Sequence, residues 1–138
     1  MAEIFSGFSE FGRVLADYIT RETAVRGAVL SDDQGDAVDL AFDEARTSAL
    51  EVQILGAQLD RAAERLTSWF QDRGRGPCEI LIEASHGRLC CAFIGGAYVL
   101  AVVSEPAQGD DEARAAAAER VLAGFRDLRR DIEALLQA

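Results

Sequence analysis

The stretch SHGRLCCAFIGGAYVLAVV (residues 85–103) decides the fold, because it gathers the only histidine, two of the three cysteines and a Gly-Gly pair. It is either a metal or thiol site, or two strands of a sheet with a tight turn at each end. His86-Gly87 predicts a two-residue hairpin turn between two strand-like segments. That turn would set Ile82 opposite Cys91 on a wholly apolar face, which we expect to be core.

The alternation of strand side chains argues against a metal or thiol site. Cys90 and Cys91 would point to opposite faces of the strand, so they could not ligate one ion together. His86 would lie at an exposed tip, and Cys78 near Gly95 would lie far from either cysteine. We therefore expect no metal, no cofactor and no catalytic residue, and interpret the cysteines as reduced thiols buried as small apolar side chains.

Two other motifs are better explained as turns than as ligand sites. Gly95-Gly96 precedes a strand-like segment, whereas a phosphate-cradling loop would precede a helix. The segment SDDQGD (residues 31–36) resembles half a calcium loop, but Ala41 stands where such a loop needs glutamate. Arg73 and Arg75 could reach an anionic group, although a solvated loop explains them as well.

Length and charge restrict the class of protein and its partners. The 138 residues suffice for one domain, 1–138, with a core of its own. A net charge of −10 disfavours nucleic acid and anionic membranes as partners. No apolar run reaches the roughly 18 residues of a membrane span, and the first residues lack the basic region of a secretory signal. We expect a cytoplasmic protein that does not insert into membranes. All 14 basic residues are arginine and asparagine is absent, which indicates a GC-rich, bacterial genome.

The segments before residue 85 predict a helix, a hairpin and a long helix. Apolar periodicity indicates the first helix over residues 4–19, with Phe8 on its buried stripe. The hairpin would turn through Asp33-Gln34-Gly35 and pair Leu30 with Val38; a shorter loop would set Leu30 against Asp39.

Asp43 could cap the long helix, which would run to about Asp72. Its stripe is wider than one sheet face requires, because Leu50, Ile54 and Ala57 add to it. This excess indicates a second partner, such as another copy of the chain; a deeply buried central helix explains it equally well.

The last part of the chain predicts three strands and a helix. The strands cover residues 78–84, 89–94 and 98–104, and the helix begins at about Asp110. The order is therefore helix, two strands, long helix, three strands, helix. This order predicts an α+β fold whose antiparallel sheet is covered by helices on both faces.

The segments RGAVLSDDQG and GRLCCAFIGGAYVLAVV, with the order of elements around them, resemble the roadblock (dynein light chain) family. The resemblance covers residues 19–136. It implies a profilin-like, five-stranded antiparallel sheet with the long helix on one face and two helices on the other.

The resemblance also implies a homodimer in which the long helices pack together and the third strands join the two sheets. The excess apolar width of the long helix fits this expectation. We expect the dimer interface to be formed by Leu50, Val52, Leu55, Leu59, Leu66, Glu79, Ile80, Leu81, Ile82 and Glu83.

By the same resemblance, the chain would be a non-enzymatic regulator that binds a Ras-like small GTPase. The composite face of the two long helices would bind this partner, oriented by Arg46, Gln53, Arg61, Glu64 and Arg65. The alternative is a scaffold or light-chain subunit of a signalling or motor-like complex, without effect on nucleotide turnover. A third hypothesis, a small hydrolase or transferase that uses a buried thiol, has little support in the sequence.

Overall fold

The computed structural model describes residues 3–72, 79–95 and 97–137. The elements follow the chain as β1 (Ile4–Ser6), α1 (Glu10–Arg21), β2 (Val25–Ser31), β3 (Ala37–Asp43), α2 (Ala49–Asp72), β4 (Glu79–Ala84), β5 (Gly87–Ile94), β6 (Tyr98–Ser104) and α3 (Asp111–Leu136). Within this part of the chain the six strands form one antiparallel sheet in the order β1-β3-β2-β6-β5-β4. The predicted α+β fold is confirmed, but the sheet has six strands rather than five.

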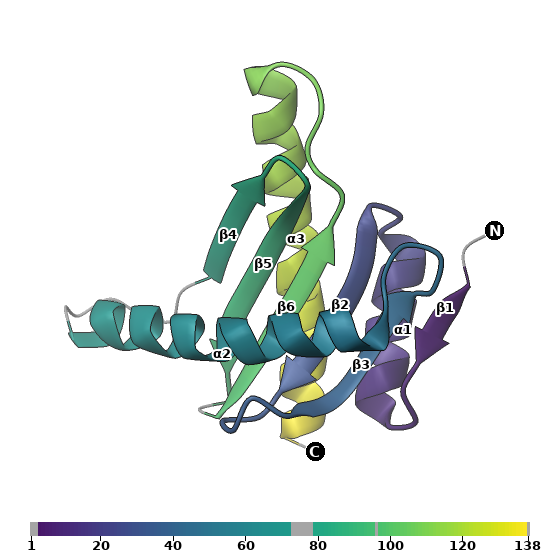
Figure 1. Cartoon of the computed structure of the whole chain (residues 1–138). Helices are drawn as coiled ribbons and strands as arrows, with labels where there is room; N and C mark the ends of the chain where they lie inside the picture. Colours follow the sequence, from purple (N-terminus) through teal and green to yellow (C-terminus); the bar gives the residue numbers. More distant parts are fainter. Residues whose placement is uncertain (1–2, 73–78, 96, 138) are drawn as a thin grey trace.

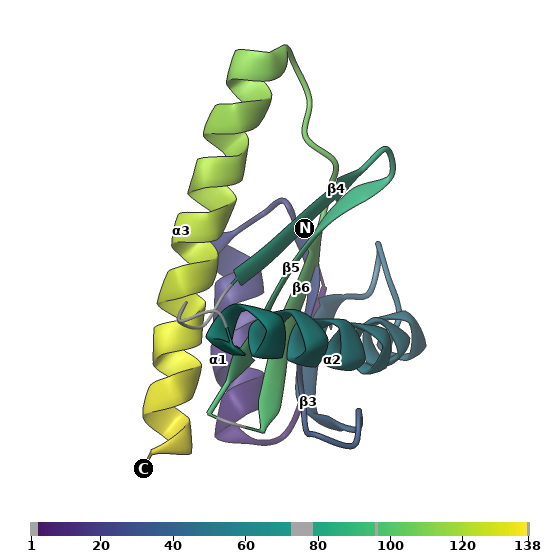
Figure 2. The same cartoon turned by 90° about the vertical axis from the view of Figure 1, so that its left-hand side faces the viewer.

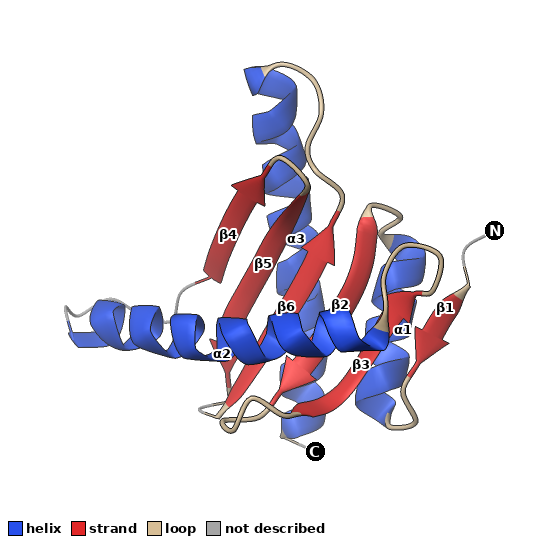
Figure 3. Ribbon diagram, in the orientation of Figure 1, coloured by secondary structure: helices blue, strands red, loops and turns tan. Residues whose placement is uncertain are grey.

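Helices cover both faces of the sheet, as Figure 1 and Figure 3 show. The long helix α2 crosses one face, and α1 and α3 lie on the other, which is clearest in the side view of Figure 2. Each face has its own apolar cluster: Val29, Phe42 and Val99 pack with α2, whereas Leu30 and Leu100 pack with α1 and α3. The sheet is therefore the middle layer of a three-layer sandwich.

The two adjacent cysteines belong to different clusters. Cys90 packs on the α1 and α3 side and Cys91 on the α2 side, as strand alternation predicts. Cys91 is buried as predicted, and Ala92 on the Cys90 face is buried as well. Conversely, Ile82 on the expected core face is 43% exposed. The reason is that α2 crosses the sheet away from the Ala84 end of β4 (Figure 1).

The first segment is a strand followed by a shorter helix, not one helix over residues 4–19. Ile4–Ser6 pairs with the edge of β3, and the Gly7 N–H donates to the Leu40 carbonyl at 3.0 Å. Ser9 then caps α1, because its hydroxyl accepts a hydrogen bond from the Gly12 N–H at 3.4 Å. Phe8, which the helical stripe would have buried, is fully exposed between the two elements.

The β2–β3 hairpin adopts the register that the apolar pattern disfavours. Leu30 lies opposite Asp39, not Val38, and the register shifts between Leu30 and Ser31. The predicted left-handed glycine is present, since Gly35 has a φ of +83°. Asp39 is tolerated inside the sheet because its carboxylate accepts hydrogen bonds from Ser9.

The β4–β5 hairpin turns one residue earlier than His86-Gly87 predicts. Gly87 pairs with Ala84, and Ile82 therefore lies opposite Leu89 rather than Cys91. Gly87 lies in β5 rather than in the turn, and its missing side chain leaves room for the guanidinium of Arg26. A Cβ at Gly87 would lie 2.4 Å from Nη2 of Arg26. That guanidinium donates to the His86 carbonyl at 3.1 Å. His86 itself is exposed, as predicted.

Of the two long helices, α3 begins where predicted and α2 begins later than predicted. Asp110 caps α3 as expected, since its side chain accepts from the Ala113 N–H at 2.8 Å. Asp43 instead ends β3, and α2 begins only at Ala49. Cys78, Arg73 and Arg75 lie outside the described residues. No helix in the described residues is long and apolar enough to cross a membrane.

Candidate protein-binding surface

The side of α2 that faces away from the sheet exposes large apolar side chains. Leu50 and Ile54 are four residues apart, so they lie on the same side of the helix. Their exposed fractions are 65% and 51%, and those of Leu66 and Trp69 farther along α2 are 42% and 45%. Single exposed apolar residues are ordinary, but several on one helix are typical of a protein-binding surface. We call Leu50, Ile54 and Trp69 the outer stripe of α2. Leu66 lies seven residues after the buried Leu59, so it is exposed on the other side of the helix.

Only some of the residues predicted for the dimer interface belong to this stripe. Leu50 does, and Leu66 is exposed on the side of α2 that carries Leu59; Val52 and Leu59 are buried against the chain's own sheet, and Leu55 is half-buried beside them. The buried position of Val52 and Leu59 follows from helical periodicity, because they lie on the side opposite Leu50 and Ile54.

Strand β4 supplies the other predicted interface residues. Glu79, Ile80 and Leu81 are half-buried, whereas Ile82 and Glu83 are exposed. Strand β4 pairs with β5, and within the described residues no strand pairs with its outer side. An edge of this kind leaves backbone donors and acceptors available to another strand.

Glu79 links this edge strand to α3 through ion pairs. Its carboxylate accepts from Nε of Arg126 at 2.9 Å, and Nη1 of Arg129 lies 3.7 Å away. These ion pairs place the carboxylate of Glu79 toward α3.

Four of the five predicted partner-binding residues are exposed on α2. These are Gln53, Arg61, Glu64 and Arg65. The fifth, Arg46, is engaged within the chain: it contacts Asp43 at 2.7 Å and donates to the backbone carbonyls of Thr23 and Val25. Only 28% of the Arg46 side chain is exposed. Its contacts connect the end of β3 to the start of β2.

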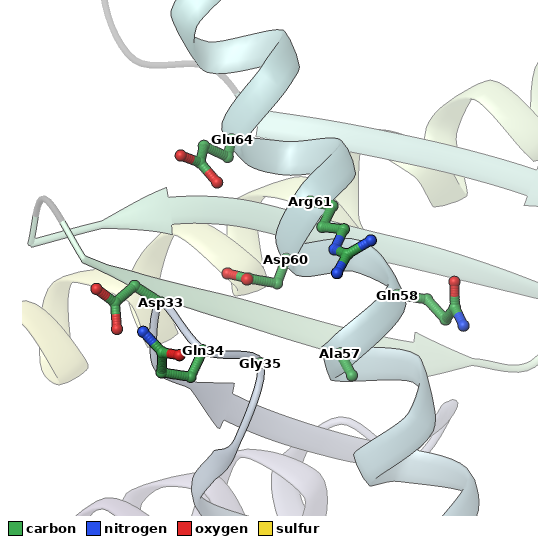
Figure 4. A pocket seen from close by; sticks show the side chains of 8 residues that line it. All are labelled: Asp33, Gln34, Gly35, Ala57, Gln58, Asp60, Arg61 and Glu64. Atoms are coloured by element: carbon green, nitrogen blue, oxygen red, sulfur yellow. The ribbon is translucent and has the colours of Figure 1, made fainter.

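An acidic pocket lies between α2 and the turn that joins β2 to β3 (Figure 4). It has a volume of about 490 Å³, and its lining residues are Asp33, Gln34, Gly35, Ala57, Gln58, Asp60, Arg61 and Glu64. No motif in the sequence predicts this pocket. The available signal was Asp60, a charged residue between the buried Leu59 and Ala63.

The charges around the pocket act on Asp60. Burial raises the pKa of the Asp60 carboxyl, and the nearby carboxylates of Glu64, Asp32 and Asp33 raise it further. Arg61 opposes this effect. The pocket is thus a region of negative potential with one buried acid at its wall.

The buried thiol of Cys90 is poorly suited to nucleophilic chemistry. Burial raises its pKa to about 12, so that it stays protonated at neutral pH. Among the residues described, His, Cys, Asp and Glu side chains form no group of three or more that could hold a metal ion.

Solved structures with the same fold exist, although no known family model and no curated protein sequence matches this chain. Myxococcus xanthus MglB superposes with a TM-score of 0.70 at 13% identity, over 94% of this chain and 97% of that one. A Roadblock/LC7 domain from Streptomyces avermitilis gives a TM-score of 0.68 at 12% identity, over 91% and 97%. An MglB with a tetrameric arrangement gives 0.61 at 14% identity, over 91% and 95%. The chain therefore has the roadblock fold, as its resemblance to that family predicts.

Proposed function

We propose that this chain is a non-enzymatic, homodimeric regulator that binds a Ras-like small GTPase. The observation that carries the proposal is the outer stripe of α2, an exposed apolar surface on a fold shared with MglB and Roadblock/LC7 domains. The GTPase as partner rests on the family resemblance of the sequence.

A second copy of the chain is the natural occupant of the outer stripe. A twofold axis across a helix places the same patch of both copies in contact, so a single apolar stripe is complementary to itself. Leu50 and Trp69 lie near opposite ends of the stripe, so an antiparallel pair of α2 helices would bring each next to the other. An MglB with a tetrameric arrangement is consistent with self-association in this fold.

The exposed edge of β4 is a second route by which two copies can associate. Ile82 adds an exposed apolar side chain to this edge. Strand pairing across the edge would extend the sheet and satisfy backbone groups that water alone now solvates.

The GTPase would contact the face that the paired α2 helices present. Gln53, Glu64 and Arg65 are exposed there and would orient the partner by charge and hydrogen bonding. Charged residues at the rim of an apolar patch determine specificity and association rate more than affinity. Arg46 keeps some exposed surface, so its contact with the partner stays a prediction.

Capture of partners on the immobilised chain tests this function. An extract of the source organism is passed over the chain in parallel with GDP and with a non-hydrolysable GTP analogue, and bound proteins are identified by mass spectrometry. We expect a Ras-like small GTPase to be retained only with the analogue. A set of partners that nucleotide does not change and that contains no GTPase would favour the scaffold function instead.

A further inference from the structure

The acidic pocket is built by a close approach of α2 to the β2–β3 turn. A Cβ added to Gly35 would lie 3.6 Å from Cα of Ala57, so the turn touches the helix there. On the same helix, a Cβ on Gly56 would lie 2.5 Å from Oγ of Ser31, which shows how closely α2 sits on β2. Asp32 orders the turn, because its carboxylate accepts from the Gln34 and Asp36 N–H groups at 2.9 and 3.0 Å.

The wall of this pocket contains a buried carboxylate that lacks a partner. Asp60 is only 5% exposed, and its Oδ1 has no hydrogen-bond partner among the described residues. Figure 4 shows its carboxylate pointing from α2 toward Asp33 and Gln34 of the turn. An acceptor buried without a donor destabilises a folded chain. The arrangement therefore favours a ligand that brings hydrogen-bond donors and positive charge.

We propose that the pocket binds the guanidinium group of an arginine side chain supplied by a protein partner. Three carboxylates, those of Asp33, Asp60 and Glu64, line it together with the side chains of Gln34 and Gln58. A guanidinium is planar and carries five N–H donors, so it can bond several such acceptors at once. This inference goes beyond the proposed function, because it holds for any protein partner that presents an arginine.

A metal ion fits the pocket less well. Within the described residues, the carboxylates form no cluster that could hold a metal. A cavity of about 490 Å³ also has room for a long side chain rather than for a bare ion.

The chain's own arginine at the rim leaves the pocket open. Arg61 lines the pocket, but Figure 4 shows its guanidinium on the other side of α2 from the Asp60 carboxylate. Gln58 and Arg61 are exposed and lie beside the outer stripe, so a protein seated on that stripe would be within reach of the pocket.

The test is an NMR titration of the full chain with N-acetyl-L-arginine amide as the probe. We expect saturable shifts of the amide signals of Gly35 and Ala57. Asp60→Asn, which keeps the shape of the side chain, should weaken binding roughly tenfold, since it removes the charge from a charge-assisted hydrogen bond. Glu64→Gln, at an exposed position, should weaken binding without any risk to folding. Asp17→Asn, an exposed change on α1, is the matched control and should leave the affinity unchanged.

Three results would overturn the proposal. The first is the absence of saturable shifts at Gly35 and Ala57. The second is an affinity for the probe that neither Asp60→Asn nor Glu64→Gln lowers. The third is saturation of the same signals by calcium or magnesium but not by the arginine probe, which would assign the pocket to a metal ion.

Discussion

Asp39 is a buried acid that the fold uses to begin its first helix. The carboxylate accepts hydrogen bonds from the Ser9 N–H at 2.9 Å and from the Ser9 hydroxyl, and Oδ1 accepts from the Leu40 N–H at 2.9 Å. A Cβ on Gly7 would collide with the same carboxylate, so the chain before α1 packs directly on it. Asp39 therefore joins β3 to the start of α1.

The pKa of Asp39 predicts how acid affects the protein. Burial alone would raise this pKa, but the hydrogen bonds from Ser9, Leu40 and Gly12 outweigh burial and lower it below 3.8. An acid whose pKa is lower in the folded state stabilises the fold above its unfolded pKa, and this contribution is lost as the pH falls through the folded value. We expect Asp39→Ala to lower the free energy of unfolding at pH 7 by about 2 kcal/mol, because the N–H groups of Ser9 and Leu40 would lose their acceptor.

Urea unfolding of the Asp39→Ala variant at pH 7 and at pH 2.5 checks this expectation. The difference from the wild type should shrink at the lower pH, where the wild-type carboxyl begins to take up a proton. Asp36→Asn, an exposed change in the same hairpin, is the control. Equal stabilities of wild type and Asp39→Ala at pH 7 would contradict the role of Asp39 in joining β3 to the start of α1.

Asp60 predicts a pH dependence of the opposite sign. Its pKa is raised above 3.8 by burial and by neighbouring acids, so the folded state keeps the proton longer than the unfolded state does. The contribution of Asp60 to stability should therefore fall as the pH rises from about 4 through the folded pKa. We expect Asp60→Asn to be more stable than the wild type at pH 7 by about 1 kcal/mol, with the difference vanishing near pH 3.5.

The same urea titrations measure this effect. A lower stability of Asp60→Asn at pH 7 would mean that the ionised carboxylate stabilises the fold, and would remove the reason to seek a cationic ligand there.

The two sides of helix α2 have different surroundings. The inner side packs Val52, Leu59 and Ala63 on the sheet, and Gly56 lets the helix approach β2 closely. The outer stripe is apolar but exposed in the single chain. The same helix therefore contributes side chains to the core and to the proposed interface.

A pair of glycine substitutions tests how closely α2 is seated. Alanine is favoured over glycine in a helix by about 1 kcal/mol. At Gly56 this gain should be reversed, since the new Cβ would lie 2.9 Å from Cγ1 of the buried Val29 and 2.5 Å from Ser31 Oγ. At Gly124 of α3 the nearest atom is Oε1 of Glu22 at 3.0 Å, the end of a flexible exposed side chain.

We therefore expect Gly56→Ala to lower the melting temperature and Gly124→Ala to leave it unchanged or raise it. Differential scanning calorimetry of both variants measures this. A Gly56→Ala variant as stable as Gly124→Ala would show that α2 can shift on the sheet at little cost.

The outer stripe predicts the effect of a charge on α2. Ile54→Glu places a carboxylate in the middle of the proposed interface, where burial against a second copy would be unfavourable. Ile54 lies outside the core, so the fold should persist. By analytical ultracentrifugation we expect this variant to be a folded monomer and the wild type to be a dimer. Gln53→Glu adds the same charge at an exposed position one residue away and should leave the dimer intact. If the Ile54→Glu variant stays a stable dimer, the outer stripe of α2 is not the dimer interface.

At the scale of the whole molecule, the sheet has two edges of different kinds. The short strand β1 covers β3 at one edge, and β4 leaves the other edge exposed. β1 spans three residues and offers little backbone to another chain, whereas β4 spans six and is the edge to which the proposed dimer would add a strand.

The sequence predicted the order and bounds of most elements because these depend on local periodicity. The three strands from residue 79 onward and the cap of α3 at Asp110 are examples. It missed β1 and both hairpin registers because these depend on contacts distant in sequence. Asp39 meets Ser9 across 30 residues, and Gly87 makes room for Arg26, which no local pattern reveals.

Only part of the surface predicted for the interface is exposed in the structure, because exposure also depends on contacts distant in sequence. The excess width of α2 at Leu50 and Ile54 was visible in the sequence, and both residues are exposed. That Val52 and Leu59 are buried against the sheet depends on which side of the helix faces it. The acidic pocket was missed because Asp33 and Asp60 come together only when the turn meets the helix.

The most direct test of the proposed function is the mass of the complex that the chain forms with the GTPase captured from its source. Native mass spectrometry of the purified pair, loaded with a non-hydrolysable GTP analogue, measures it. If the GTPase binds the composite face of two α2 helices, the complex contains two copies of this chain and one GTPase, and none forms with GDP. A complex of one chain with one GTPase, or no complex in either nucleotide state, would contradict the account.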